Sequence, residues 1–418
     1  MTHVGRRTPT IEIREDEVAV CVDEMALLGR HPEGGLYRAV YTPAWQQAVD
    51  TFTGWLKSAG LEAKQDAVGN VFGVLEGTQP GPSILTGSHI DTAIQGGPLD
   101  GTLGVIAGFL ALRALKEAHG PPRRTLEVVA VCDEEASRFH SNFWGSRAIA
   151  GLIRPGEAES IFDADGISLA DAMRGCQLDP SAVEKARRDD IDTFIELHIE
   201  QGPLLEREGV PVGVVMAITA IEQLEFEVRG RADHAGGFPM DLRRDPMIGA
   251  AEMVLSATKA ALELGEPAVA TVGKIRARPG SPNIVAADVT FTVDARYPDQ
   301  ARHERFVAAI ADSFDAIARR NGLELNHKRL LYQPATQSTQ ELVATIKSAA
   351  AELGYPCREI VSGAGHDTQV LARTGVGRAM IFVPSVNGRS HAPDEWTPLP
   401  DQVKGIAVLT ETLHRLAY

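Results

Sequence analysis

The sequence is poor in cysteine and contains no long hydrophobic run. Its four cysteines are scattered and form no CxxC pair: Cys21, Cys132, Cys176 and Cys357. This pattern argues against a disulfide framework and favours reduced thiols. No stretch is apolar enough to predict a signal peptide or a transmembrane helix. We therefore expect a cytoplasmic protein that does not associate with a membrane.

The chain also has fewer basic than acidic residues. The chain has 41 Lys and Arg against 56 Asp and Glu, which gives a formal net charge of −15. Nucleic acids and anionic membrane surfaces are bound through basic surfaces, so we expect neither as a partner. An anionic substrate would have to be attracted by local positive charge rather than by the field of the whole protein. We find no internal repeat and no low-complexity segment.

Two glycine-rich segments, 87–92 (GSHIDT) and 96–101 (GGPLDG), place Asp100 eleven residues after His89. Neutral imidazole is a good ligand for zinc, manganese, cobalt or nickel. A carboxylate can bridge two cations roughly 3.5–4 Å apart. The apolar run 83–86 predicts a strand that ends before His89, where open α/β sheets place their ligands. The spacing predicts part of a two-metal hydrolase site; the alternative is a surface histidine beside a turn aspartate.

Acidic residues follow the next predicted strand. The apolar run 126–131 is followed closely by Glu134 and Glu135. Adjacent glutamates point in different directions from a strand end, so one can bind metal while the other faces a bound water as general base. The alternative is a solvated acidic turn.

Two more histidines are associated with predicted strands. The alternation of segment 194–200 places His198 on the same face as two glutamates. The apolar run 379–383 precedes a loop that carries His391. Four strand ends that each offer a histidine or a carboxylate favour one shared metal site over four unrelated accidents.

The organisation of the chain is discontinuous. At 418 residues, with 44% hydrophobic and 23% charged residues, the chain is typical of a globular protein with at least two cores. Helices and buried strands alternate up to about residue 212. A βαββαβ order follows, which is typical of a ferredoxin-like unit; its elements are predicted at 224–228, 245–264, 268–277, 284–294, 299–320 and 323–330. We predict an α/β catalytic domain of residues 1–212 and 332–418, interrupted by a smaller α+β domain at 213–331.

The motifs GSHIDT, GGPLDG, DEE-ASRF, ELHIEQGP, DHAGG-PM, SPN, DAR, GAGHD and NGRSHAP occur in this order. Together they resemble the hydantoinase/carbamoylase amidases of the M20 metallopeptidase clan, from about residue 24 to near the C-terminus. That branch includes N-carbamoyl-L-amino-acid hydrolases, allantoate amidohydrolases and β-ureidopropionases. The resemblance implies a two-metal catalytic domain, an inserted lid and dimerisation domain, and a homodimer.

The resemblance also implies a role for each candidate residue. Two divalent ions (Zn, Mn, Co or Ni) would be bound by His89, Asp100, Glu135, His198 and His391. Asp100 would bridge the ions, and Glu134 would be the general base. We do not assign His366 as a ligand, because five ligands suffice for two ions with water. The implied substrate contacts are Gln201 to the ureido group, His234 to the oxyanion, Asn283 and Arg296 to the carboxylate, and backbone N–H groups near Gly363 and Ala364.

The expected reaction is hydrolysis of a ureido or carbamoyl C–N bond in a small anionic substrate, with release of ammonia and CO2. N-carbamoyl-L-amino acids and allantoate both present a ureido group beside a carboxylate. Segments 221–224 and 237–238 depart from the family pattern, so the substrate is left open between them. One alternative is an M20 aminoacylase or dipeptidase, which the context of Gln201 disfavours. Another is a non-catalytic metal-dependent binding protein, which the presence of Glu134 disfavours.

Overall fold

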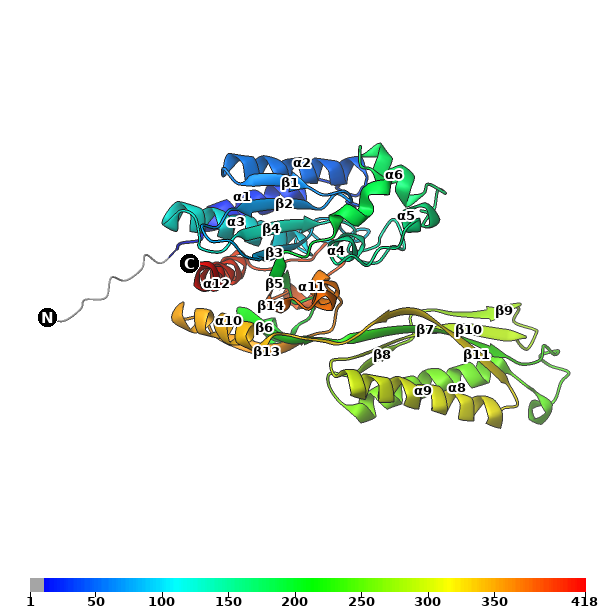
Figure 1. Cartoon of the computed structure of the whole chain (residues 1–418). Helices are drawn as coiled ribbons and strands as arrows, with labels where there is room; N and C mark the ends of the chain where they lie inside the picture. The colour runs from blue at the N-terminus through cyan, green and yellow to red at the C-terminus, as the bar shows by residue number, and fades with distance from the viewer. Residues whose placement is uncertain (1–10) are drawn as a thin grey trace. The chain divides into compact units, whose positions relative to one another are not determined.

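The computed structural model describes residues 11–418, which fold into two compact units. The first unit contains the residues up to Met216, Ser338–Ile360 and His366–Tyr418; the second contains Ala217–Gln337 and Val361–Gly365. Figure 1 traces this path by colour along the chain. The boundaries predicted from the sequence fall a few residues earlier, and the assignment of segment 361–365 to the second unit was not predicted. The expectation that no signal peptide is present partly concerns residues 1–10, which lie outside the described residues.

A mixed sheet forms the centre of the first unit. Its strands are β1 (Glu62–Gln65), β2 (Val71–Leu75), β3 (Ser83–His89), β4 (Leu126–Val131), β5 (Ile191–Ile199), β6 (Val212–Ile218), β13 (Cys357–Ser362), β14 (Gly377–Val383) and the short β12 (Thr336–Gln337). Strand β12 and the last residues of β6 and β13 belong to the second unit. Their order is β1-β2-β4-β3-β5-β14-β6-β12, with β13 paired to β6. Strands β4, β3, β5 and β14 run parallel to one another, so their carboxyl ends lie at the same edge of the sheet.

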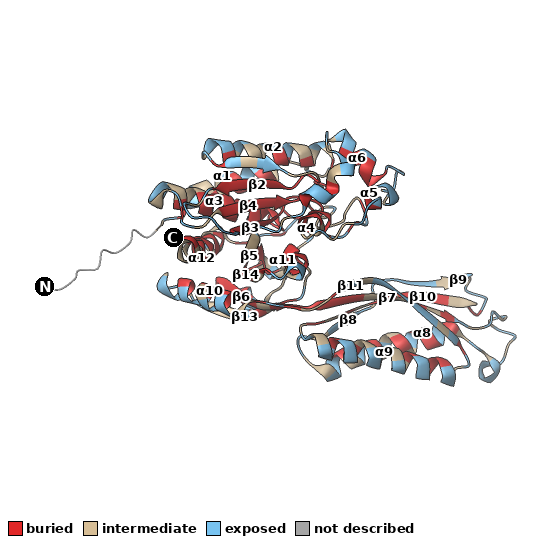
Figure 2. Cartoon of the chain, in the orientation of Figure 1, coloured by how far each residue is buried: buried red, intermediate tan, exposed pale blue. Residues whose placement is uncertain are grey.

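Both faces of this parallel centre are buried, as the red strands in Figure 2 show. Parallel strands covered on both faces are nearly continuous hydrophobic runs, which explains the apolar runs in the sequence. The helices of this unit are α1 (Glu15–Ala26), α2 (Pro43–Ser58), α3 (Thr102–His119), α4 (Trp144–Ile149), α5 (Glu157–Ser160), α6 (Leu169–Gly175), α7 (Leu204–Glu208), α10 (Gln340–Glu352), α11 (Asp367–Leu371) and α12 (Leu399–Ala417). Short 3-10 helices span Pro180–Ala186, Ala372–Thr374 and Val386–Gly388.

Helix α3 packs tightly against the central strands. Its first eleven residues are all buried. A Cβ atom at Gly104 would lie 2.3 Å from the carbonyl oxygen of Leu197 and 2.7 Å from Cβ of Ser88. Only glycine therefore allows this close approach of helix and sheet. The approach fixes the start of α3, and with it Asp100, beside the ends of β3 and β5.

The second unit is an antiparallel sheet packed against two helices. Its elements are β7 (Ala220–Arg229), a 3-10 helix (Met240–Leu242), α8 (Pro246–Leu264), β8 (Val269–Thr271), β9 (Ile275–Arg278), β10 (Asp288–Tyr297), α9 (Gln300–Arg320) and β11 (Glu324–Gln333). The strand order is β11-β7-β10-β8, with β9 also paired to β10. Strand β10 alternates strictly between half-buried and buried residues, as expected for a sheet with one covered face. The observed order is βαβββαβ, which differs from the predicted βαββαβ order by one additional short strand.

Two details of the second unit differ from the prediction. The strand predicted at 268–277 is interrupted around Gly273, so that β8 and β9 pair separately with β10. The strand predicted at 284–294 begins only at Asp288, because Ile284 forms an isolated bridge with His234 instead.

Two expectations from composition can be compared with the structure. All four cysteines are free thiols. Among residues 11–418, no helix is both long enough and apolar enough to cross a membrane.

Candidate metal centre

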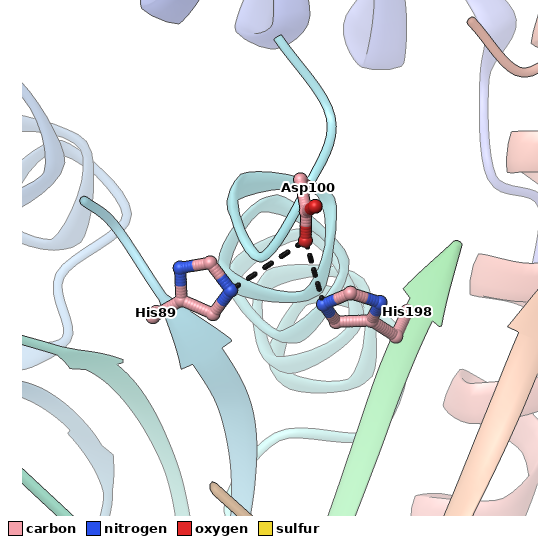
Figure 3. Close-up of side chains that lie close together, drawn as sticks. All are labelled: His89, Asp100 and His198. Atoms are coloured by element: carbon pink, nitrogen blue, oxygen red, sulfur yellow. Dashed lines mark ion pairs between the residues drawn. The ribbon is translucent and has the colours of Figure 1, made fainter. Parts of the chain in front are cut away.

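The predicted ligands of the first unit meet at the carboxyl edge of the sheet. His89 ends β3, His198 lies near the end of β5, and Asp100 directly precedes the first turn of α3. Figure 3 shows both imidazole rings facing the carboxylate of Asp100. Oδ1 of Asp100 is 3.1 Å from Nε2 of His198 and 3.6 Å from Nε2 of His89.

The second oxygen of Asp100 faces a different pair of side chains. Its Oδ2 is 3.1 Å from Nε2 of His391, which follows β14. The same nitrogen of His391 is 3.3 Å from Oε1 of Glu135. One carboxylate thus contacts two separate groups of potential ligands, which is the arrangement expected of a bridging residue.

These residues fit divalent metal ions. The potential ligand atoms of His89, Asp100 and His198 lie within 4.8 Å of one another, and so do those of Asp100, Glu135 and His391. Oε1 of Glu135 is buried and has no hydrogen-bond donor among the described residues. A buried carboxylate oxygen without a donor is costly unless a cation or proton satisfies it. Imidazole and carboxylate donors suit zinc, manganese, cobalt and nickel.

The other ring nitrogens of the buried histidines are held by backbone carbonyls. Nδ1 of His89 is 3.0 Å from the carbonyl oxygen of Asp91, and Nδ1 of His198 is 2.9 Å from that of Ile199. These contacts place the proton on Nδ1 and leave the Nε2 lone pair for a ligand bond. The carboxylate of Asp91 lies farther from this nitrogen, with its Oδ1 3.8 Å from Nδ1 of His89.

The carboxylate of Asp91 instead holds the loop that carries the two glutamates. It accepts hydrogen bonds from the backbone N–H groups of Glu134 and Glu135, each at 3.1 Å. Asp133 and Ala136, on either side, have φ values of 54° and 51°. Left-handed backbone at two non-glycine residues makes a tight loop. Both glutamates therefore lie near the histidines, with Oε2 of Glu134 3.8 Å from Nε2 of His89.

Burial and mutual repulsion shift the pKa values of the carboxyl groups. Burial raises the pKa of Glu134 well above its ordinary value, and Glu135 and Asp367 add to the effect. Burial, with Asp100 nearby, raises the pKa of Glu135 to about 7. For Asp100, burial is outweighed by its interactions with the three histidines, which hold its pKa well below the usual range. A cation in this crowded anionic cluster would relieve the repulsion.

Gln201 lies at the edge of the cluster. Its Nε2 donates hydrogen bonds to Oδ2 of Asp100 at 2.9 Å and to Oγ of Ser390 at 3.2 Å. Its Oε1 is buried without a hydrogen-bond partner among residues 11–418. The amide oxygen is therefore free to accept an N–H group, although the contact with a ureido group stays a prediction.

The remaining predicted substrate contacts belong to the second unit, including the segment with Gly363 and Ala364. Nδ1 of His234 accepts hydrogen bonds from the backbone N–H groups of Gly236 and Gly237, at 3.1 and 2.9 Å. An Nδ1 that accepts leaves the proton of neutral imidazole on Nε2. The exposed His234 thus offers an N–H donor, as an oxyanion requires.

Asn283 and Arg296 are held by local contacts of the second unit. The carbonyl of Asn283 accepts a hydrogen bond from the N–H of Ala235 at 3.0 Å, which fixes it beside the His234 loop. Nε and Nη2 of Arg296 bind the carboxylate of Asp294 at 2.7 and 3.0 Å. Its Nη1 donates to the carbonyl oxygen of Gly363 at 2.7 Å. The side chain that was predicted to bind substrate is thus already oriented.

Several residues around the cluster were not predicted from the sequence. Ser390 and Glu395 contact the Asp100 turn, and Asp367 is buried with both carboxylate oxygens unpartnered among the described residues. His366, which was not assigned as a ligand, is buried and forms a compact group with Glu196 and His198. Their position in the sequence is the one feature that could have indicated them. Ser390 and Glu395 lie in the loop of His391, and His366 and Asp367 end the GAGHD motif.

The chain is similar to known proteins over most of its length. The profile of peptidase family M20/M25/M40 matches residues 85–415. The chain is 38% identical to the allantoate amidohydrolase of Escherichia coli (strain K12), over 94% of this chain and 96% of that protein. It is 39% identical to the N-carbamoyl-L-amino-acid amidohydrolase of Paenarthrobacter aurescens, over 91% of this chain and 93% of that protein.

A solved structure shares both fold and sequence. The hydantoinase/carbamoylase family amidase from Burkholderia multivorans aligns with a TM-score of 0.90 and 33% identity, over 98% of this chain and 99% of that chain. The family resemblance inferred from the motifs is thereby confirmed. The chain belongs to peptidase family M20/M25/M40, and within it to the hydantoinase/carbamoylase amidases.

Proposed function

We propose that this enzyme is a divalent-metal-dependent amidohydrolase that cleaves a ureido or carbamoyl C–N bond of a small carboxylate substrate, releasing ammonia and CO2. The observation that carries the proposal is the buried carboxylate of Asp100, whose two oxygens contact two different imidazole-containing groups. The substrate class is supported by relatives named allantoate amidohydrolase and N-carbamoyl-L-amino-acid amidohydrolase.

Two ions per subunit, of zinc, manganese, cobalt or nickel, suit the donor set. His89 and His198 would hold one ion and Glu135 and His391 the other, with Asp100 between them. Divalent ions in such a site polarise a carbonyl group and lower the pKa of water.

Side chains of the protein would then transfer the proton of the attacking water and stabilise the negative charge that develops on the oxyanion. Glu134 has no part in the ligand assignment and lies next to the cluster, so it would take a proton from the attacking water and return it to the leaving nitrogen. The Nε2–H of His234 would donate to the oxyanion. Oε1 of Gln201 would accept an N–H group of the ureido function.

The substrate carboxylate would be bound by the second unit. Nε and Nη2 of Arg296 already bind Asp294, so Arg296 would use the remaining N–H groups of its planar guanidinium, a group whose geometry matches a carboxylate. Asn283 and the backbone N–H groups near Gly363 and Ala364 would add neutral donors. We further propose that this unit acts as the lid and dimerisation domain of a homodimer.

A surface of the second unit supports the dimer. Ile248, Leu255 and Leu262 recur every seven residues along α8 and are 48%, 71% and 77% exposed. Side chains at this spacing lie on one side of a helix. Strand β8 also ends the sheet order on that side of the unit, which leaves an edge available for pairing.

The direct test is ammonia release from allantoate and from a panel of N-carbamoyl-L-amino acids, with manganese added and after chelation. Chelator-sensitive release from one class would support the proposal and identify the substrate. Absence of release from both classes by metal-loaded protein, together with cleavage of N-acyl amino acids or dipeptides, would contradict it.

A further inference from the structure

One buried carboxylate links the two loops that carry Asp100 and His391. Glu395 follows β14 by twelve residues and is 2% exposed. Its Oε1 accepts hydrogen bonds from the backbone N–H groups of Leu99 at 3.0 Å and Asp100 at 2.9 Å. Its Oε2 accepts one from the N–H of His391 at 3.3 Å. A single side chain therefore satisfies backbone donors of two segments that are nearly 300 residues apart.

Ser390 strengthens this link. Its Oγ is 2.7 Å from Oδ2 of Asp100 and 3.1 Å from Oε2 of Glu395. The hydroxyl lies between the two carboxylates and within hydrogen-bond reach of both. The contacts of Glu395 are thus well suited to fixing where Asp100 and His391 lie.

The turn before Asp100 is shaped around Glu395. A Cβ atom at Gly97 would lie 2.3 Å from Cβ, Cδ and Oε1 of Glu395. Gly97 is not among the residues with positive φ, so the requirement for glycine is one of space. Any larger residue at 97 would have to displace the carboxylate.

Glu395 is not a member of any ligand group found among residues 11–418. We propose that Glu395 is a positioning residue, which holds the Asp100 turn against the His391 loop and so assembles the ligand set of Asp100, Glu135 and His391. The inference rests on the proposed metal-dependent function. The other set, His89 and His198 with Asp100, has two of its members on strands β3 and β5, and depends less on Glu395.

The test measures metal binding rather than turnover. Full-length Glu395→Gln is stripped with a chelator and titrated with Zn²⁺ or Co²⁺ in competition with a chromophoric chelator. Loss of a residue that orients metal ligands typically costs about 10- to 100-fold in metal affinity. We expect one of two ions to bind 10- to 100-fold more weakly, while the other binds as in wild type.

A matched control separates positioning from general stability. Glu157 is another buried carboxylate of the first unit and accepts hydrogen bonds from the N–H of Arg154 and from Nη2 of Arg147. Glu157→Gln removes a comparable buried charge away from the site. We expect it to lower the thermal unfolding temperature without changing the affinity for either ion.

A second variant disturbs the position of Glu395 through its neighbour Gly97. Gly97→Ala leaves Glu395 chemically intact but displaces it. We expect the same selective loss of one ion. The double variant should bind that ion no more weakly than the more impaired single variant, because the effects of substitutions that act through one contact are not additive.

Wild-type affinity for both ions in Glu395→Gln and Gly97→Ala would overturn the inference. If one variant folds too poorly to be titrated with metal, the metal affinities of the other variant test the inference. Failure of the wild-type protein itself to bind divalent ions would contradict the proposed function instead, so the two failures are distinguishable.

Discussion

At the scale of single residues, hydrogen bonds to the backbone determine which ring nitrogen of each histidine remains available in the site. Backbone carbonyls occupy Nδ1 of His89 and His198, so their Nε2 atoms face Asp100. Backbone N–H groups occupy Nδ1 of His234, so its Nε2 carries a proton. The same residue type is thereby prepared as a ligand in one unit and as a hydrogen-bond donor in the other.

Replacement of Glu134 by glutamine is expected to abolish turnover and leave metal binding intact. Glutamine keeps the shape of the side chain but cannot accept and return a proton. General acid–base catalysis contributes about 10²- to 10⁴-fold, so kcat should fall by that factor or more. Ammonia release and metal content of the same sample check this. Activity near that of the wild type would refute the assignment of Glu134 as the base.

Replacement of Arg296 by alanine is expected to weaken recognition of the substrate carboxylate. A hydrogen bond to a charged group is worth about 1.5–3 kcal/mol, so kcat/KM should fall about 10- to 100-fold. A substrate analogue with a carboxamide in place of the carboxylate serves as the control, because its turnover should change little. Equal losses for both compounds would mean that Arg296 has a structural role through Asp294 and Gly363.

Most candidate residues could be predicted because each lies in a local pattern. An apolar strand followed by a histidine or carboxylate is visible in the sequence for His89, Glu135 and His391. Glu395 could not be predicted, because its hydrogen bond to Leu99 joins residues 296 positions apart. The orientation of Arg296 by Asp294 also depends on side-chain geometry that no spacing reveals.

At the scale of elements, helix α3 determines where Asp100 lies. Gly104→Ala is expected to destabilise the protein by about 1–3 kcal/mol, because the added Cβ would clash with the carbonyl oxygen of Leu197. Gly175→Ala, at the end of α6, is the control, since nothing lies within 4 Å of its Cβ position. Urea unfolding of both variants tests this; equal stability of the two variants would contradict the proposed tight packing.

The elements themselves were predicted with uneven success. β4 spans the predicted residues, and α8 begins after Asp245, whose side chain accepts a hydrogen bond from the N–H of Met247 as an N-cap residue does. Both elements have strong local signals, an apolar run and an Asp-Pro start. The interruption at Gly273 was missed, since period-two alternation does not reveal how β8 and β9 pair with β10.

At the scale of the whole molecule, the proposed homodimer makes a prediction about α8. Leu255→Lys places a charge at the centre of the exposed apolar row, so it should convert a dimer into monomers. Light scattering coupled to size-exclusion chromatography measures the mass. Val20→Lys, at an exposed valine on α1 of the first unit, is the control and should leave the mass unchanged. A dimeric Leu255→Lys would exclude this surface as the interface.

We propose that bound divalent metal makes this protein a ureido amidohydrolase. This proposal is tested most directly by titrating chelator-treated protein with Mn²⁺ while measuring bound metal and ammonia release from the preferred substrate. We expect metal-free protein to release no ammonia, and activity to rise as two ions bind per subunit. Full activity in metal-free protein would contradict it.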